Sequence, residues 1–109
     1  MVERSASLDL VYGSLADPTR RDILRRLAGH ELSIRQIAHP YKITFAAISK
    51  HVMVLERAGL VTKRRRSKEQ VVSLLPKALV AAADYLKFYQ DLWEGRMDSL
   101  AQYLAKEKE

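Results

Sequence analysis

The 109-residue sequence has no cysteine at all. This absence excludes disulfides, thiol redox sensing and thiolate metal ligands. The sequence also has no apolar run of about 18 residues or more, so we expect no membrane-spanning helix. Its first twenty residues lack a basic segment followed by an apolar one, which is evidence against a signal peptide. We therefore expect a cytoplasmic protein.

Acidic residues are nearly missing from the middle of the sequence. Between Arg35 and Lys68 there are nine basic residues and a single acid, Glu56, so this segment carries +8 and the rest of the chain −2. Such an asymmetry is typical of a surface that faces a polyanion on an otherwise mildly charged protein. A basic face that is merely solvated is the alternative that charge alone leaves open.

Recognisable catalytic motifs are also missing. Serine, histidine and aspartate are all present, but none lies in a nucleophile elbow, a phosphate-binding loop or a paired-carboxylate context. We therefore expect that the chain is not an enzyme and that it carries no cofactor.

The length of the chain suits one domain, residues 1–109. Apolar spacing at helical period, with Asp17, Ser33 and Thr44 as N-caps and Gly59 as a stop signal, predicts five helices. Their expected ranges are 8–15, 18–28, 34–39, 45–58 and 76–105.

The order of the middle elements predicts a winged helix-turn-helix. The two helices joined around Lys42 outline a helix-turn-helix at about 33–58. Two extended segments follow, Leu60 to Arg65 and Gln70 to Leu74, joined by a polar turn over residues 66–69, so that a wing is expected at about 60–74. The fold class is therefore mainly α with a small β-hairpin and a long C-terminal dimerisation helix.

The C-terminal helix carries more apolar surface than one small domain can cover. Leu79, Leu86, Trp93 and Leu100 recur every seven residues, and further apolar residues fill the neighbouring positions. The simplest use is a helix that packs partly on its own domain and partly on a second copy, so we expect a homodimer. The residues assigned to the dimer interface are Leu8, Val11, Tyr12, Leu86, Tyr89, Trp93, Met97 and Leu100.

Several segments in order resemble the arsenic-repressor (ArsR/SmtB-type) family of winged-helix regulators. They are LADPTRR at 15–21, ILRRL at 23–27, ELS at 31–33 and, most strongly, AISKHVMVLERAGLV at 47–61. The resemblance covers roughly residues 8 to 105. It implies a homodimer, an operator with two-fold symmetry, and repression that is relieved by some signal.

The resemblance makes residues 44–58 the recognition helix, and the apolar stripe of that helix leaves one side facing outward. The residues expected to contact DNA there are Thr44, Phe45, Ala46, Ser49, Lys50 and His51. Ser49 and Lys50 suit a base edge or a phosphate, whereas Thr44 is also the N-cap. Phe45 departs from the polar residue common in the family, and it either presses on a thymine methyl or packs against the preceding turn. His51 is either a phosphate contact or a structural hydrogen-bonding group, and we favour the second.

The wing, residues 63–70, would supply further DNA contacts from Arg64, Arg65, Arg66 and Lys68. Strand alternation sends neighbouring side chains to opposite faces, so all three arginines are not expected to touch DNA together. We favour Arg66 and Lys68, near the tip. Ser67 stands where the family often has glycine, which leaves the type of turn open.

The metal sites that the resemblance brings to mind lack their ligands here. Ser33, Ile34 and Arg35 occupy the place of the arsenic-binding cysteine pair. The C-terminal helix has carboxylates but no histidine, and His30, His39 and His51 lie in three different elements. We expect no metal. An unidentified organic effector is the remaining possibility. It would bind at the dimer seam near four aromatic residues, whose alternative role is to pack in the core: Tyr85, Tyr89, Trp93 and Tyr103.

These observations predict a sequence-specific regulator that binds double-stranded DNA, a homodimeric repressor acting on a palindromic operator. The alternative is a winged-helix module for protein–protein interaction with no specific operator. The run Lys63 to Arg66 beside Lys50 favours DNA, because a protein-binding wing has no need of so much positive charge.

Overall fold

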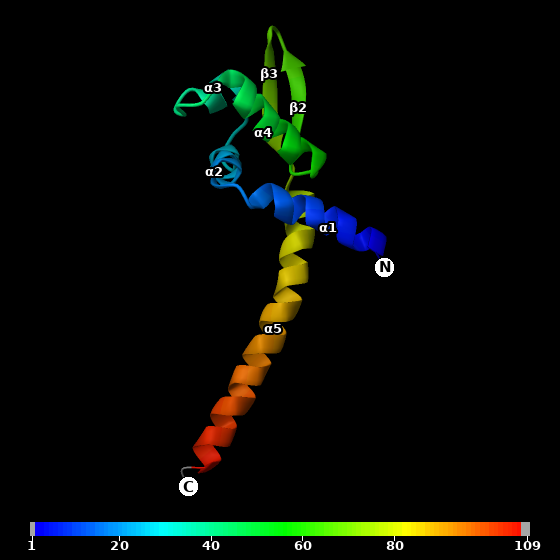
Figure 1. The fold of residues 1–109 in the computed structure, drawn as a ribbon, viewed down its shortest axis with the longest axis vertical. Helices are drawn as coiled ribbons and strands as arrows, with labels where there is room; N and C mark the ends of the chain where they lie inside the picture. Colours follow the sequence, from blue (N-terminus) through cyan, green and yellow to red (C-terminus); the bar gives the residue numbers. More distant parts are fainter. Residues whose placement is uncertain (1, 108–109) are drawn as a thin grey trace. The chain divides into compact units, whose positions relative to one another are not determined.

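The computed structural model describes the backbone of residues 2–107 and the side chains of residues 8–107. The chain divides into two compact units, Met1–Leu79 and Val80–Glu109. The elements of the first unit are α1 (Val2–Leu15), α2 (Pro18–Leu27), β1 (Leu32–Ser33), α3 (Ile34–Ala38), α4 (Phe45–Arg57), β2 (Val61–Arg66) and β3 (Glu69–Leu74) (Figure 1). The long helix α5 (Pro76–Glu107) begins at the end of the first unit and forms the second from Val80 onward.

Helix α2 begins at the cap that the sequence predicts. The Asp17 carboxylate accepts hydrogen bonds from the amides of Thr19 (2.8 Å) and Arg20 (3.1 Å), and Pro18 occupies the first helical position. Burial acts to raise the pKa of the Asp17 carboxyl, but the hydrogen bonds from the Arg20 and Thr19 amides outweigh it and the pKa lies below its ordinary value of 3.8. The cap therefore depends on an ionised Asp17.

The two helices of the helix-turn-helix are also started by the predicted caps. Ser33 and Gln36 form a reciprocal capping box, with N–O distances of 3.1 and 2.8 Å. The Thr44 hydroxyl oxygen accepts from the Ala47 amide at 3.1 Å, and Gly59, at a φ of 79°, follows the end of α4. The C-terminal ends of α2, α3, α4 and α5 differ from the predicted ones by one or two residues, as expected where the last turn frays. Helix α1 begins at Val2, six residues before the predicted start at residue 8.

The predicted hairpin belongs to a three-stranded antiparallel sheet with the order β1-β3-β2. The third strand, β1, was missed because its two residues are too few to show a period. The wing turn is also tighter than predicted, because Arg66 and Glu69 pair in the ladder and leave only Ser67 and Lys68 between the strands. Ser67 has a φ of 58°, in the region that glycine adopts most easily.

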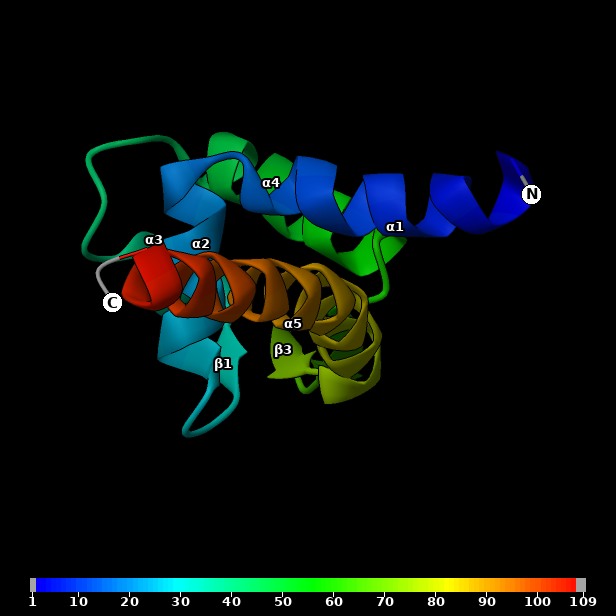
Figure 2. The same cartoon turned by 90° about the horizontal axis from the view of Figure 1, so that it is seen from below.

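The core of the first unit is built from the predicted apolar faces of α2, α3 and α4 and from both hairpin strands. Burying each of these large side chains stabilises the fold by about 1.5–3 kcal/mol. The helix residues are at most 8% exposed: Ile23, Leu24, Leu27, Ile34, Ile37, Ile48, Val52 and Leu55. The sheet and the residue before it contribute Leu60, Val61, Val71 and Val72, also buried. Helix α1 packs on α2 and lies alongside α4 (Figure 2).

The second unit is a single stretch of α5 whose large apolar side chains are exposed. The predicted helix over 76–105 is confirmed and continues to Glu107. From Val80 onward Ala82 is its one buried side chain among the described residues. None of the helices within residues 2–107 is both long and apolar enough to cross a membrane.

Candidate nucleic-acid interface

The first half of α4 presents small and polar side chains on the side away from the core. Thr44, Phe45, Ala46 and Lys50 are exposed and Ser49 is half-buried. The opposite side is fully buried at Ile48, Val52 and Leu55. Because the outward side chains Ala46 and Ser49 are small, the backbone of the helix can come close to base edges in a major groove. Of the five outward residues, Thr44 uses its hydroxyl oxygen within the protein, as the cap of α4.

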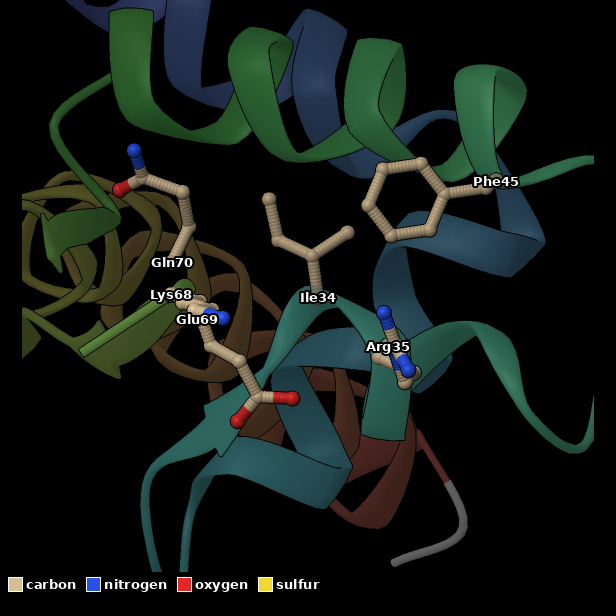
Figure 3. Close-up of a pocket in the computed structure, with 6 residues that line it drawn as sticks. All are labelled: Ile34, Arg35, Phe45, Lys68, Glu69 and Gln70. Carbon is tan, nitrogen blue, oxygen red and sulfur yellow. The ribbon is translucent and has the colours of Figure 1, made fainter. Parts of the chain in front are cut away.

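Phe45 lies beside a small hollow between α4, α3 and the wing turn. Its side chain is 55% exposed, and the hollow, about 110 Å³, is lined by Ile34, Arg35, Phe45, Lys68, Glu69 and Gln70. Figure 3 shows the Phe45 ring and the Ile34 side chain pointing into the same space. The ring therefore lines this hollow together with Ile34 of α3 and keeps a large exposed surface at the start of α4.

His51 lies at the boundary between the exposed and buried sides of α4 and is hydrogen-bonded. Its Nδ1 lies 3.3 Å from Nη1 of Arg20, whose other donors reach the carbonyl oxygens of Ser14 (2.6 Å) and Gly13 (3.2 Å). A guanidinium has no acceptor, so Nδ1 must accept and the ring proton sits on Nε2. His51 thus makes a structural hydrogen bond, the alternative that we favoured from the sequence, and through Arg20 of α2 it links the end of α1 to α4.

The connection between α3 and α4 is held by a network that the sequence analysis did not anticipate. The Tyr41 hydroxyl donates to the carboxylate of Asp22, and Arg26 lies over the Tyr41 ring at 5.4 Å. Arg26 also donates to the carbonyl oxygens of Ile37 (2.7 Å) and Gln36 (2.9 Å). Burial and the bond to Asp22 raise the pKa of Tyr41 above 10.0, so the phenol keeps its proton. These contacts from α2 fix the turn that orients α4.

The wing divides its basic side chains between its two faces. Because side chains alternate along a strand, Arg64 and Arg66 share one face of β2 and Arg65 lies on the other, opposite Gln70 of β3. All three arginines are exposed, as is Lys68 in the turn. The expectation that the arginines would not act as one group agrees with this register.

Arg64 and Arg66 both bind the carboxylate of Glu31, which directly precedes β1. Nη2 of Arg64 lies 2.9 and 2.8 Å from the two Glu31 oxygens, and Nη2 of Arg66 lies 2.7 Å from one of them. The Ser73 hydroxyl donates to the same carboxylate at 3.1 Å. Burial acts to raise the pKa of Glu31, but these donors and the positive charges of the arginines lower it below 4.5.

Sequence reasoning missed Glu31 as a functional residue. It lies 33 and 35 positions before its arginine partners, and only the pairing of β1 with β3 brings it to the wing. No local spacing signals such a contact. A second pair, Lys63 with Glu56 at 3.5 Å, ties the base of the wing to α4.

The residues predicted for the dimer interface fall into two groups. In α1, Val11 is buried within the chain itself at 3% exposure, and Leu8 and Tyr12 are half-buried. In α5 the predicted side chains are more than two-fifths exposed: Leu86, Tyr89, Trp93, Met97 and Leu100. The α5 group is thus apolar surface that the single chain leaves open.

Among the described residues, no group of three or more histidine, aspartate or glutamate side chains is placed to hold a metal ion. His39 and His51 lie on α3's end and on α4, and His30 lies in the loop before β1. The carboxylates of α5 have no histidine near them in sequence.

Comparison with known proteins agrees with this geometry. A family profile described as "Helix-turn-helix domain" matches residues 15–64. The chain is 33% identical over 101 residues, 93% of its length and 92% of the relative's, to the HTH-type transcriptional regulator Rv2034 of Mycobacterium tuberculosis (strain ATCC 25618 / H37Rv). It is 33% identical over 58 residues, 53% of its length and 64% of the relative's, to the transcriptional repressor SdpR of Bacillus subtilis (strain 168).

Solved structures give the same result. An ArsR family transcriptional regulator superposes with a TM-score of 0.78 at 27% identity, covering 83% of this chain and 93% of that one. A homodimeric winged helix-turn-helix DNA-binding domain from Mycobacterium bovis superposes with a TM-score of 0.68 at 23% identity, covering 83% of each chain. With its helix-turn-helix, its cationic wing and a near full-length relative, the chain belongs to the ArsR family of winged helix-turn-helix transcriptional regulators, which are DNA-binding proteins and not enzymes.

Proposed function

We propose that this regulator is a homodimeric repressor that binds an operator with two-fold symmetry. The observation that carries the proposal is the outward side of α4. There Ala46 and Lys50 are exposed and Ser49 is half-buried, just after the N-cap Thr44, and the same unit carries the basic wing. In this scheme α4 enters the major groove and selects the sequence, while the wing binds the backbone. We assign the contacts to Thr44, Phe45, Ala46, Ser49, Lys50, His51, Arg64, Arg65, Arg66 and Lys68.

Dimerisation would come from the open apolar surface of α5 and, on the other unit, from Leu8 and Tyr12 of α1. A contiguous apolar patch on the surface of a small chain marks an interface, and the exposed apolar side chains of α5 form such a patch. A dimer would present two recognition helices to successive major grooves, roughly 34 Å apart, and so match a palindrome. Residues 1–109 would then act as one functional domain in the cytoplasm, where the operator lies.

Repression has support from the relative SdpR, which is described as a transcriptional repressor. A dimer bound across a promoter would exclude RNA polymerase by occupying its site.

The test is binding of the purified protein to the DNA upstream of its own gene, with a scrambled duplex of equal length as the control. We expect tight binding to the upstream duplex and weak binding to the scrambled one. If the dimer neutralises about 6 to 10 phosphates, its affinity should fall by about a thousandfold or more between 50 and 200 mM salt. Equal, weak binding to both duplexes would contradict an operator upstream of the protein's own gene. It would favour the alternative, a winged-helix module that binds another protein.

A further inference from the structure

Three donors from two strands converge on the single carboxylate of Glu31. Arg64 and Arg66 approach it from β2, and the Ser73 hydroxyl approaches from β3, with donor–oxygen distances between 2.7 and 3.1 Å. Arginine forks of this kind bind carboxylate and phosphate oxygens through the same charge-assisted hydrogen bonds. The site that holds Glu31 is therefore chemically suited to a phosphate group.

The sheet explains why these groups meet. β3 is the central strand, and the pairing of Leu32 with Val72 puts the residue before β1 level with Ser73. Arg64 and Arg66 are two residues apart on β2, so both side chains reach across β3 on the same face. The contact is thus a product of register, and it occupies two of the three arginines that the wing offers to DNA.

The three charged side chains are open to solvent. The side chains of Arg64 and Arg66 are 53% and 60% exposed, and that of Glu31 is 32% exposed. Water screens ion pairs at such exposure and leaves them weak, so a phosphate that approaches the wing can displace the carboxylate. Each contact to Glu31 uses Nη2 of its arginine, so the carboxylate does not occupy the Nε and Nη1 donors of Arg64 and Arg66.

We propose that Glu31 is an internal competitor for the DNA backbone: its carboxylate occupies the phosphate-binding donors of Arg64 and Arg66 and so limits non-specific affinity. The inference rests on the proposed function, in which the wing binds the DNA backbone. Glu31 acts as a bound counterion that is part of the chain. Its displacement leaves a carboxylate near the DNA, which reduces the gain from releasing salt ions. Affinity for any duplex falls, while readout by α4 stays unchanged.

The test is Glu31→Gln, which keeps the size of the side chain and removes its charge. Glu69→Gln is the matched control, because it makes the same charge change nearer the wing tip, and the Glu69 carboxylate forms no ion pair with the side chains of residues 8–107. Binding to a labelled scrambled duplex is followed by fluorescence anisotropy from 50 to 200 mM salt. We expect Glu31→Gln to bind about three- to tenfold tighter at 50 mM salt, with a salt slope steeper by about one per protomer.

The competition also predicts how the substitutions combine. In the Arg64→Ala/Arg66→Ala background Glu31→Gln should have no effect beyond that of Glu69→Gln, because the donors for which it competes are gone. A gain that persists in that background, or one that merely equals the gain from Glu69→Gln, would show a general charge effect and overturn the proposal. Weaker binding by a folded Glu31→Gln protein would show that the carboxylate positions the arginines for DNA, which also overturns it.

A second variant covers the case in which Glu31→Gln unfolds the wing, as judged by thermal unfolding. Ser73→Ala leaves the carboxylate in place and removes one of the bonds that hold it, so a smaller increase of the same sign is expected, and a decrease overturns the proposal. Retention on immobilised heparin distinguishes failure of the proposed function from failure of the competition by Glu31. If the protein shows no preference for any operator, the proposed function fails, yet later elution of Glu31→Gln than of Glu69→Gln would still support competition by Glu31.

Discussion

The two units of this chain treat their apolar residues in opposite ways. In the first unit the core-facing apolar side chains of α2, α3, α4 and the hairpin are buried, several of them completely. In the second unit, from Val80, side chains as large as Trp93 and Phe88 are about three-fifths exposed. The first unit forms a core of its own and leaves a few apolar side chains exposed, such as Phe45 and Met53. The second unit leaves most of its large apolar side chains exposed, and a surface of this kind marks an interaction site.

The comparison separates two kinds of sensitivity. Changes in the first unit should alter the stability or the DNA contacts of each chain by itself. Changes in the second unit should act through association, and their effects should depend on protein concentration. The following predictions test this division.

The largest effect is expected from Trp93→Glu. A charge in the centre of the exposed α5 surface should prevent association, and operator binding should fall by more than about a hundredfold because one half-site binds weakly. Sedimentation should show monomers, while circular dichroism should retain the helices of the first unit. Glu94→Gln, also on α5 but among its polar residues, is the control. A dimer of unchanged mass would refute the role given to Trp93.

Lys50→Ala should follow, with an effect on choice of sequence. Loss of a base contact costs about 1–3 kcal/mol per site, and the substitution should therefore reduce the ratio of operator to scrambled binding about tenfold or more. Arg66→Ala should instead weaken binding to both duplexes alike, since a backbone contact carries no sequence information. Equal losses of discrimination from both substitutions would contradict the division of work between α4 and the wing.

Asp17→Ala tests whether the first unit is stabilised locally. Loss of the cap of α2 should lower the free energy of unfolding by about 1 kcal/mol at pH 7, at fixed protein concentration. A carboxyl with a lowered folded pKa stabilises the fold above its unfolded pKa, and this stabilisation is lost as pH falls through the folded value. The difference between the two proteins should therefore shrink below pH 3.8, the ordinary pKa of the group.

Urea unfolding at pH 7 and pH 3 measures the effect of Asp17→Ala. Asp17→Asn serves as the control, because an amide oxygen still accepts from the Thr19 and Arg20 amides but does not ionise. A difference between wild type and Asp17→Ala that grows on acidification would contradict the assigned direction of the pKa shift.

Ser67→Gly should have the smallest effect and the opposite sign. The positive φ of 58° strains a residue with a Cβ, whereas glycine adopts it freely. Part of that gain is offset by the greater entropy of glycine in the unfolded chain, so we expect a stabilisation of about 0.5 kcal/mol. Thermal unfolding measures it, and a loss of stability would show that the Ser67 side chain contributes more to the turn than its backbone strain costs.

Sequence patterns predicted the elements whose signals are local. Asp17 with Pro18, Ser33 and Thr44 each stand within three residues of the amides they satisfy, so these caps were visible in the sequence. The reciprocal bond to Gln36 was not predicted. The long helix α5 was predicted because its apolar residues repeat over many turns. For the same reason the outward residues of α4 could be named before the structure was known.

Features that depend on long-range register were not predicted. β1 has only two residues, and it forms because β3 offers it an edge. Glu31 and Tyr41 reach partners 19 to 42 residues away, and nothing in the spacing of Tyr41 and Asp22 or of Glu31 and Arg64 predicts those contacts. The charge count predicted a polyanion or solvent as the partner of the wing arginines, whereas the fold gives Arg64 and Arg66 an internal partner, Glu31.

The Arg20 guanidinium has a mechanical consequence. It donates hydrogen bonds to the carbonyl oxygens of Gly13 and Ser14 near the end of α1 and to the His51 ring of α4, so it links the two helices directly. If α4 rotates in a DNA groove, it must either move the end of α1 with it or break the hydrogen bond between Arg20 and His51. The Arg20 side chain thus adds a directional hydrogen-bonded link to the packing of α1 against α4, so a change in the orientation of one helix is passed to the other.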